Sequence, residues 1–334
     1  MNSFGRLFRI SIFGESHGKS VGIVIDGCPA GIPLKTEDFE ADFSRRRSGG
    51  IGTTPRREPD IPRIMSGLFD GYTTGAPITI VFENTSARPG DYSRLVDFPR
   101  PGHADFTASR KFGGYQDYRG GGHFSGRLTL GLVAAGVIAR KIILPAEVTA
   151  FLTEAGGSSD IEGAVNRAVE EQDSIGGIVE CRISGVPVGL GEPFFDSVES
   201  VMSHLVFSIP AIKGIEFGSG FRAAKMKGSE HNDNIVGTDG TTETNHAGGI
   251  NGGITNGNEV LFRVAVKPTS STHQSQQTMN FRTGKVETLK IEGRHDTCIA
   301  LRVPVVLEAA AAVVMADLML QSQAVARVNK PKFV

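Results

Sequence analysis

The sequence predicts a single α+β domain, spanning residues 1–334, in which buried helices lie among strands. Runs rich in Val, Ile and Phe alternate along the chain with two alanine- and valine-rich helical segments that are apolar on most faces. No proline- or serine-rich linker divides the chain. The 43 glycines follow no collagen-like period, so they indicate bends and close approaches in a loop-rich fold.

The first half of the chain predicts two strands and two helices. Residues 20–26 and 77–82 are expected to be strands, because β-branched residues dominate them and turn residues flank them. Thr36 is the expected N-cap of a helix that reaches the arginines at 45–47, with acidic residues in its first turn as the helix dipole favours. Residues 128–142 predict a helix that is buried on most faces.

The second half predicts the same kinds of element. Residues 161–171 form an amphipathic pattern typical of a more exposed helix. Residues 177–183 and 259–266 are expected to be strands, and residues 304–320 a long buried helix. The chain therefore alternates between strands and helices throughout.

One pattern occurs twice. Gly71-Tyr-Thr-Thr-Gly75 and Gly253-Ile-Thr-Asn-Gly257 each precede a predicted strand. Each half also pairs an arginine-bearing loop with an alanine-rich helix, at Arg127 and at Arg302. The echo fits an ancient internal duplication, and it also fits chance, because this kind of turn is common.

Composition limits the classes of function. The 35 basic and 36 acidic residues give a net charge of -1, so no overall positive field would attract nucleic acid or an anionic membrane. The three cysteines are far apart and odd in number, which fits a reducing cytosol and favours neither a disulfide framework nor a metal site. The amino terminus lacks a signal-peptide pattern, and the apolar run at 309–315 is too short to span a bilayer. We therefore expect a cytoplasmic protein.

Three loops place an arginine beside or near a histidine: Arg100-Pro-Gly-His103, Arg119-Gly-Gly-Gly-His123 and Arg294-His295. Arginine suits phosphate and carboxylate, and histidine can transfer a proton near neutral pH. The second loop leads into a predicted helix, whose free N–H groups favour an anion, although it is neither a Walker A loop nor a dinucleotide fingerprint. Together these loops predict a site that binds a strongly anionic molecule and moves protons on it.

Other segments have two interpretations each. Phe13-Gly-Glu-Ser-His-Gly18 can present polar side chains to a ligand or can be a turn whose side chains cap the local backbone. The arginines at 45–47 and 56–57 can be a solvated surface or a loop that closes over phosphate. Residues 245–253 and 267–271 can hold a cofactor phosphate or can be plain loops.

In this order, the segments closely resemble the chorismate synthase family over nearly the whole chain. A match to several long motifs in the same order is too specific to arise by chance. The motifs that carry the resemblance are Phe13-Gly-Glu-Ser-His-Gly18, Arg45-Arg46-Arg47, Arg100-Pro-Gly-His-Ala-Asp105, Asp117-Tyr-Arg-Gly-Gly-Gly122, Ser125-Gly-Arg127, Asn245-His-Ala-Gly-Gly249, Lys267-Pro-Thr-Ser-Ser271 and Gly293-Arg-His-Asp296.

The resemblance implies a β-α-β sandwich, with antiparallel sheets around a helical layer, that is usually a homotetramer. It implies a lyase that converts 5-enolpyruvylshikimate 3-phosphate to chorismate by 1,4-anti elimination of phosphate, the last common step of the shikimate pathway in aromatic amino acid biosynthesis. The family requires reduced FMN although the reaction has no net redox change. NADPH would serve only indirectly, for flavin reduction. The short chain implies dependence on an external flavin reductase or another reductant.

The resemblance also implies residue roles. His103 would protonate the departing phosphate, His17 would protonate or polarise the reduced flavin, and Asp296 would help to remove the ring hydrogen through flavin N5. The implied substrate-binding residues are Ser16, Arg46, Arg100, Ser125, Arg127 and Arg294. The implied flavin-binding residues are Arg46, His123, Phe124, Ser125, Pro210, Ala211, Gly252, Lys267, Pro268, Thr269, Ser270, Ser271 and Arg294. No metal is implied.

The chain departs from the family pattern in four places. His123 and Phe124 stand where arginine and serine are usual, Ile51-Gly52 where a second arginine is expected, and Pro210 where asparagine is frequent, and the segment around 145–160 is short. The departures at 123 and 124 place side-chain contacts to flavin there in question.

Two other classes of protein share parts of the pattern. A phosphate-binding flavin oxidoreductase would use similar glycine loops but would consume a stoichiometric reductant. A non-catalytic polyanion binder would also cluster arginines, but the near-zero net charge and the 7% aromatic content argue against it.

Overall fold

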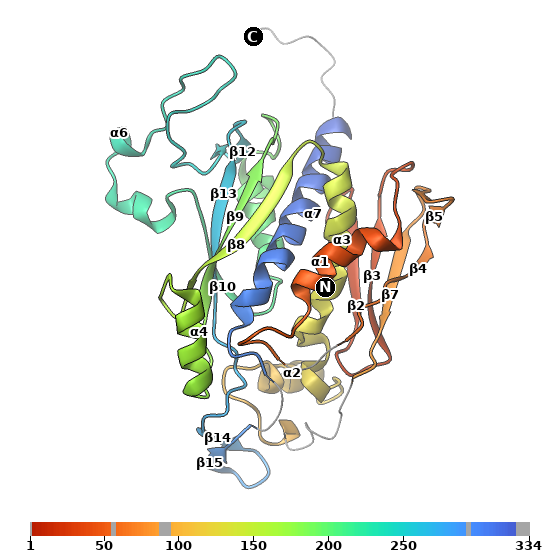
Figure 1. The fold of residues 1–334 in the computed structure, drawn as a ribbon, viewed down its shortest axis with the longest axis vertical. Coiled ribbons are helices and arrows are strands. Elements are labelled where there is room, and N and C mark those ends of the chain that lie inside the picture. Colours follow the sequence, from red (N-terminus) through yellow and green to blue (C-terminus); the bar gives the residue numbers. More distant parts are fainter. Residues whose placement is uncertain (1, 55–57, 87–94, 292–294, 325–334) are drawn as a thin grey trace.

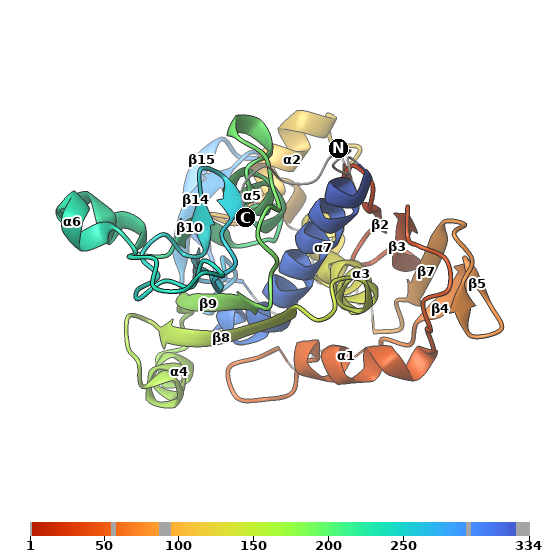
Figure 2. The same cartoon turned by 90° about the horizontal axis from the view of Figure 1, so that it is seen from above.

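A computed structural model of the chain describes residues 2–54, 58–86, 95–291 and 295–324. Two antiparallel sheets enclose a layer of helices, as Figures 1 and 2 show from two directions. The α+β prediction and the expected β-α-β sandwich are therefore confirmed.

The first sheet has the strand order β1-β2-β3-β7-β4, and every neighbouring pair is antiparallel. Alternate residues of its central strands face the helices, so that Val21, Ile23 and Ile25 are almost fully buried. A small hairpin lies between β4 and β7 in the sequence. The strands are β1 (Ser3–Phe4), β2 (Arg9–Gly14), β3 (Ser20–Asp26), β4 (Arg63–Ser66), β5 (Leu68–Phe69), β6 (Tyr72–Thr73) and β7 (Ile78–Glu83).

The second sheet has the order β10-β13-β9-β8 and is also antiparallel throughout. Its buried face comes from the same alternation, with Val260, Phe262 and Val264 turned toward the helices. Two further hairpins are short. The strands are β8 (Glu147–Ala155), β9 (Gly177–Ser184), β10 (Ile212–Phe217), β11 (Ile250–Asn251), β12 (Ile254–Thr255), β13 (Val260–Val266), β14 (Gln276–Asn280) and β15 (Lys285–Leu289).

Two long helices form the centre of the middle layer. Helix α3 (Thr129–Ile142) packs on β3, and α7 (Val303–Ala324) packs on β8 and β9. The other α-helices are α1 (Glu40–Arg46), α2 (Asp105–Phe112), α4 (Ile161–Glu170), α5 (Val198–Val206) and α6 (Gly228–His231). The 3-10 helices are η1 (Thr36–Phe39), η3 (Arg119–Phe124), η4 (Gly126–Leu128), η5 (Phe194–Asp196), η6 (Gly220–Lys225) and η7 (Ile299–Arg302).

Small residues allow the two central helices to pack closely. A Cβ atom added to Gly136 of α3 would lie 2.5 Å from the Cα atom of Ala309 in α7. The neighbouring alanines at 134, 135 and 310 are completely buried. Close approach gives many van der Waals contacts between the helices and keeps the middle layer thin enough for both sheets to contact it.

Two buried carboxylates tie α7 to the rest of the molecule. Glu308 accepts two hydrogen bonds from Arg45, at 2.6 and 2.7 Å, and one from Arg140 at 3.1 Å. It also accepts the backbone N–H of Ala150 at 2.8 Å. Asp317 accepts three backbone N–H groups of residues 6–8. Both carboxylates are hydrogen-bonded, and Glu308 is also ion-paired. These interactions offset the free-energy cost of burying the two charges.

Several predicted elements are confirmed, and some boundaries are wrong. The strand at 20–26 is confirmed to the residue. The expected cap at Thr36 is wrong, because the N-cap residue is Lys35 and the chain first forms a 3-10 turn before α1 begins at Glu40. The helix predicted from residue 128 begins instead with the separate turn η4.

The apolar C-terminal helix is longer than predicted. Among the described residues, 299–324 are helical and apolar enough to cross a membrane. Most of this segment is buried inside the protein. Its composition is therefore explained by its position between the sheets.

The two halves share a local hydrogen-bonding pattern. The hydroxyl of Thr73 donates to the carbonyl of Pro29 at 2.6 Å, and that of Thr255 donates to the carbonyl of Pro187 at 2.7 Å. Each hydroxyl also accepts, at 2.9 Å, the N–H of the residue three positions after the proline. The order β2-β3-β7-β4 in one sheet matches β8-β9-β13-β10 in the other.

The contact between α3 and α7 makes a prediction for stability. Gly136→Ala should lower the free energy of unfolding by about 1–3 kcal/mol because the added methyl overpacks the helix crossing. This loss should outweigh the gain of about 1 kcal/mol that alanine brings to a helix. Urea unfolding followed by circular dichroism measures the change. Gly228→Ala is the control, since an added Cβ there meets no atom within 4 Å. A Gly136→Ala protein as stable as the wild type would contradict the packing argument.

Candidate active site

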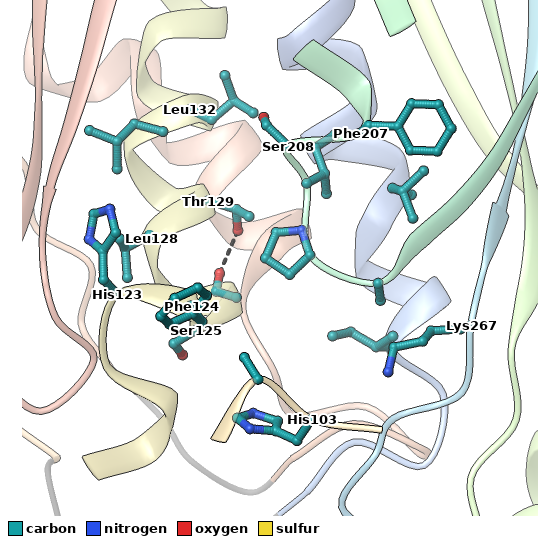
Figure 3. A pocket seen from close by; sticks show the side chains of 18 of the residues that line it. His103, His123, Phe124, Ser125, Leu128, Thr129, Leu132, Phe207, Ser208 and Lys267 are labelled. Carbon is teal, nitrogen blue, oxygen red and sulfur yellow. Dashed lines mark hydrogen bonds between the residues drawn. The ribbon is translucent and has the colours of Figure 1, made fainter. Parts of the chain in front are cut away.

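Two adjoining cavities lie at the end of the sandwich near α2. Their volumes are about 730 and 600 Å³, which is the usual range for small-molecule sites. Figure 3 shows side chains that converge on the larger one from several elements. The residues that line both cavities are Arg100, Gly120, Ser125, Gly126, Thr269 and Ile299.

The two cavities differ in chemistry. The larger has apolar side chains, among them Phe4, Phe124 and Leu132, beside polar and basic ones such as Lys267. The smaller is lined by arginines and carboxylates, namely Arg46, Arg47, Arg100, Arg127, Arg302, Glu58, Asp60 and Asp296. A flat apolar group suits the first, whereas an anion suits the second.

A run of three glycines separates two histidines of the candidate site. Gly120, Gly121 and Gly122 have φ angles of +59°, +81° and +52°, which side chains rarely allow. A Cβ atom on Gly120 would collide with the ring of His17, and one on Gly121 would lie 3.3 Å from the ring of His103. Glycine is therefore required both by backbone conformation and by the closeness of the two imidazoles.

His103 forms a hydrogen-bonded pair with Asp105. Its Nδ1 lies 2.6 Å from an oxygen of Asp105, and Arg100 donates to both oxygens of the same carboxylate at 2.7 and 2.8 Å. A carboxylate only accepts, so Nδ1 carries the proton and Nε2 is left for a ligand.

The surroundings shift the pKa values of this pair. Burial lowers the pKa of His103 below its ordinary 6.5, and the hydrogen bond that His103 donates to Asp105 offsets this only in part. Although burial acts to raise it, hydrogen bonds from Arg100 and His103 hold the pKa of Asp105 well below its usual range. The free protein therefore presents a neutral His103 beside an ionised Asp105 at neutral pH.

His17 lies behind the glycine run. It is buried, with Nδ1 at 3.3 Å from the hydroxyl of Ser16. Ser16 and Gly120 line the smaller cavity, but His17 does not line either one. The structure thus places Ser16 at the predicted site and His17 next to it.

Asp296 lines the smaller cavity and has partners from two segments. Its oxygens accept the backbone N–H of Thr54 at 2.9 Å and a guanidinium N–H of Arg302 at 2.5 Å. Arg294, predicted to bind substrate and flavin, lies outside the described residues. Arg302, at the start of the last helix, is a site residue that the sequence analysis did not assign.

Among the described residues, the predicted flavin-binding residues meet at the larger cavity, with two exceptions. Residues 123–125, 210–211 and 267–271 line it. Gly252 lines neither cavity and lies in the turn between β11 and β12, while Arg46 lines the smaller cavity only. Neither Gly252 nor Arg46 therefore lines the larger cavity of its own chain, and both stay predictions.

His123 and Thr269, which both line the larger cavity, differ in their hydrogen bonding. His123 uses both ring nitrogens in contacts within the protein, with the carbonyl of Gly14 at 2.8 Å and the side chain of Asn2 at 3.0 Å. The hydroxyl of Thr269 is buried without a hydrogen-bond partner among the described residues. His123 therefore anchors the first strands, whereas Thr269 keeps its hydrogen-bonding capacity for a ligand.

The 267–271 loop is tied to the histidine loop. Lys267 Nζ and the Ser270 hydroxyl both donate to the carbonyl of Gly102, at 2.6 and 2.7 Å. Ser271 accepts a hydrogen bond from Arg100 at 3.0 Å. These bonds hold His103 in the wall of the larger cavity, close to Arg100, which lines both cavities. Within the described residues, no group of three or more His, Cys, Asp and Glu side chains could hold a metal ion.

Comparisons with known proteins agree with this geometry. A family model described as chorismate synthase matches residues 8–320. The chorismate synthase of Chitinophaga pinensis is 64% identical over 331 residues, which cover 99% of this chain and 100% of that protein. The enzyme of the same name from Methanocaldococcus jannaschii is 41% identical and covers 96% of this chain and 97% of its own length. A crystal structure of a chorismate synthase matches with a TM-score of 0.73 and 25% identity, over 95% of this chain and 93% of that one.

The His103–Asp105 pair makes a prediction for titration. In the free protein, nuclear magnetic resonance should give His103 a pKa below 6.5. Asp105→Asn should lower this pKa further, because it removes the charge that opposes the effect of burial. His231, which lines neither cavity, is the internal reference and should not change. A higher pKa for His103 in the variant would contradict the assigned contact.

Proposed function

The chain belongs to the chorismate synthase family, and from this we propose that the larger cavity binds reduced FMN and the smaller one 5-enolpyruvylshikimate 3-phosphate. The family reaction eliminates phosphate from this substrate to give chorismate, so the protein is a lyase of the shikimate pathway. The observation that carries the assignment of the cavities is their contrast, apolar on one side and rich in arginine on the other.

The residues of the larger cavity fit a flavin. Its volume of about 730 Å³ accommodates a cofactor of this size. Phe124 and Leu132 would pack on the ring, Thr269 would supply its unpaired hydroxyl, and Lys267 would face the phosphate. When bound, reduced FMN would supply the electron-rich centre that the elimination requires without net redox change.

The smaller cavity fits the charges of the substrate. 5-Enolpyruvylshikimate 3-phosphate carries one phosphate and two carboxylates, and Arg46, Arg100 and Arg127 face the same cavity. Each buried charge-assisted hydrogen bond contributes roughly 1.5–3 kcal/mol. Ser16 and Ser125 would add hydroxyl donors at the edge of the cavity. We keep Arg294 as a proposed contact by family resemblance.

Three residues would move protons. His103 would donate the proton that the departing phosphate takes up. Its low pKa in the free protein would rise when the dianionic phosphate arrives, because a nearby negative charge favours the imidazolium ion. Asp296 would receive the proton lost from the ring. His17 would hold its proton behind Gly120, toward the flavin.

We propose further that the enzyme is a cytoplasmic homotetramer that uses an external flavin reductase or another reductant, with NADPH acting only through that partner. Gly252 supports the oligomer. It belongs to the family pattern for flavin contacts but lines neither cavity of its own chain. In a homotetramer, a neighbouring subunit would supply it.

We also propose that residues 1–334 form one domain that arose by duplication. Support comes from the matched threonine contacts and strand orders of the two halves. The paired glycines agree as well, since Gly71 and Gly253 have φ angles of +77° and +87°, and Gly75 and Gly257 have +84° and +91°. The same backbone turn therefore precedes β7 and β13.

Phosphate release under anaerobic conditions tests the function. The purified protein should release phosphate from 5-enolpyruvylshikimate 3-phosphate only when reduced FMN is present. A catalytic amount of reduced flavin should support many turnovers. Oxidation of one flavin per product would instead indicate a flavin oxidoreductase, and no phosphate release under either condition would contradict the proposal.

The role of His103 makes a separate prediction. His103→Ala should bind FMN like the wild type but release phosphate at least ~100-fold more slowly, as expected for the loss of a general acid. His231→Ala, which lies outside both cavities, should keep full activity. Near-normal phosphate release by His103→Ala would remove His103 from the mechanism.

A further inference from the structure

Asp60 lies at the wall of the smaller cavity between two of its arginines. Its side chain is 3% exposed. One carboxylate oxygen forms a short ion pair with Arg127, and the other lies 3.4 Å from Arg46. These two arginines come from different parts of the chain, α1 and η4. Asp60 is therefore a shared counter-ion for two groups that face the substrate.

The backbone at Asp60 is held in an unusual conformation. Its φ angle is +51°, a left-handed value that costs a non-glycine residue of order 1 kcal/mol. The residues on either side keep it there. Arg47 donates to the carbonyl of Pro59 at 3.1 Å, and Glu58 accepts hydrogen bonds from Thr85 and Ser86. The loop is thus fixed to the end of α1 and to the segment after β7.

The two arginines are almost fully engaged by the protein. Arg46 donates to Thr129, to the carbonyl groups of Gly126 and Arg127, and to Asp60. These four contacts leave it one of its five N–H donors. Arg127 donates to Asn84 and to the carbonyl of Glu83 as well as to Asp60. Few donors remain for the substrate, so their direction is decisive.

A carboxylate in an anion site has opposing effects. It repels an arriving anion, which weakens binding of any simple anion. It also keeps neighbouring guanidinium groups from repelling each other out of position. Burial lowers the pKa of Arg46 to about 9, Asp60 and Asp296 oppose this shift, and Arg127 and Arg302 add to it. Among the described residues, Asp60 is the carboxylate that pairs with Arg46 and opposes the effect of burial on its pKa.

We propose that Asp60 is a positioning residue that orients Arg46 and Arg127 for the substrate at the expense of affinity for simple anions. The inference rests on the proposed function of the smaller cavity. Arg46 and Arg127 touch the substrate, and Asp60 acts through them. Asp60 thereby favours a ligand whose several anionic groups match the fixed donors over free phosphate.

Asp60→Asn tests the charge alone, because asparagine tolerates a left-handed φ angle as well as aspartate does. For 5-enolpyruvylshikimate 3-phosphate with reduced FMN, kcat should fall roughly tenfold or more, as for misplaced catalytic contacts. Inorganic phosphate, measured by isothermal titration, should bind about fivefold more tightly, because a repelling charge is gone. A lower kcat together with tighter phosphate binding would not result from partial unfolding, because partial unfolding lowers both kcat and phosphate affinity.

Asp70→Asn is the matched control. Asp70 also has a left-handed φ angle, +48°, but is exposed in the turn between β5 and β6. Its substitution should change neither kcat nor phosphate affinity. Unchanged kcat in Asp60→Asn, or weaker phosphate binding, would overturn the proposal while leaving the assigned reaction intact. An inactive wild type would instead contradict the proposed function.

Asp60→Gly provides a second test if the asparagine variant does not fold. Glycine adopts the left-handed φ angle without strain, and removing the side chain leaves room for formate between the two guanidinium groups. Added formate should restore part of kcat in this variant and should not raise kcat of the wild type. If Asp60→Gly folds and added formate does not raise its kcat, the proposal is overturned. It is also overturned if neither Asp60→Asn nor Asp60→Gly folds.

Discussion

The close crossing of α3 and α7 is the constraint on which the rest of the structure depends. At Gly136 the two helices approach so closely that a single methyl group would not fit. This contact sets the thickness of the middle layer and therefore the distance between the two sheets. Both helices run in the same direction, away from the end of the sandwich where α2 lies (Figure 1). Their shared direction brings their amino-terminal ends together.

The position of the site follows from this arrangement. Residues just before α3, including Gly126 and Arg127, and residues just before α7, including Arg302, line the smaller cavity. Helix amino termini present free N–H groups and the positive end of the helix dipole. A neutral protein can therefore gather an anion at one end without a positively charged surface elsewhere. The arginines add full charges where the backbone already supplies partial ones.

The sequence predicts the elements whose pattern is local. The strand at 20–26 alternates apolar residues between turns, and the helix of residues 304–320 is too apolar for any place but the interior. Strand β8 went unrecognised because it lies at a sheet edge, where its exposed positions carry Glu147, Thr149 and Phe151 together. The predicted start of α1 was wrong. The side chain of Asp38 accepts the backbone N–H of Lys35, and residues 36–39 form a 3-10 turn before α1 begins.

Within the site, the residues in long motifs could be predicted and their partners could not. His103, Ser16 and the 267–271 loop are recognisable from the motifs in which they occur. Asp60 acquires its role only by meeting Arg127, which is 67 positions away, and no local spacing signals that contact. Asp105 is different, since it lies only two residues from His103, and this local spacing is visible in the sequence. Gly252 shows the opposite limit, because it belongs to the family pattern and yet lines neither cavity of its own chain.

The arginines of the smaller cavity are hydrogen-bonded within the protein in the absence of a ligand. Arg46, Arg100 and Arg127 use most of their N–H donors in this way, so little reorganisation would remain if the proposed substrate bound, which is the condition under which electrostatic stabilisation is most effective. His103 is the exception, because burial keeps its pKa low until a ligand supplies negative charge. The acid would therefore be charged mainly in the presence of the phosphate that needs its proton. The hydrogen-bonded arginines would thus fix the geometry of the site, and His103 would take up a proton when phosphate binds.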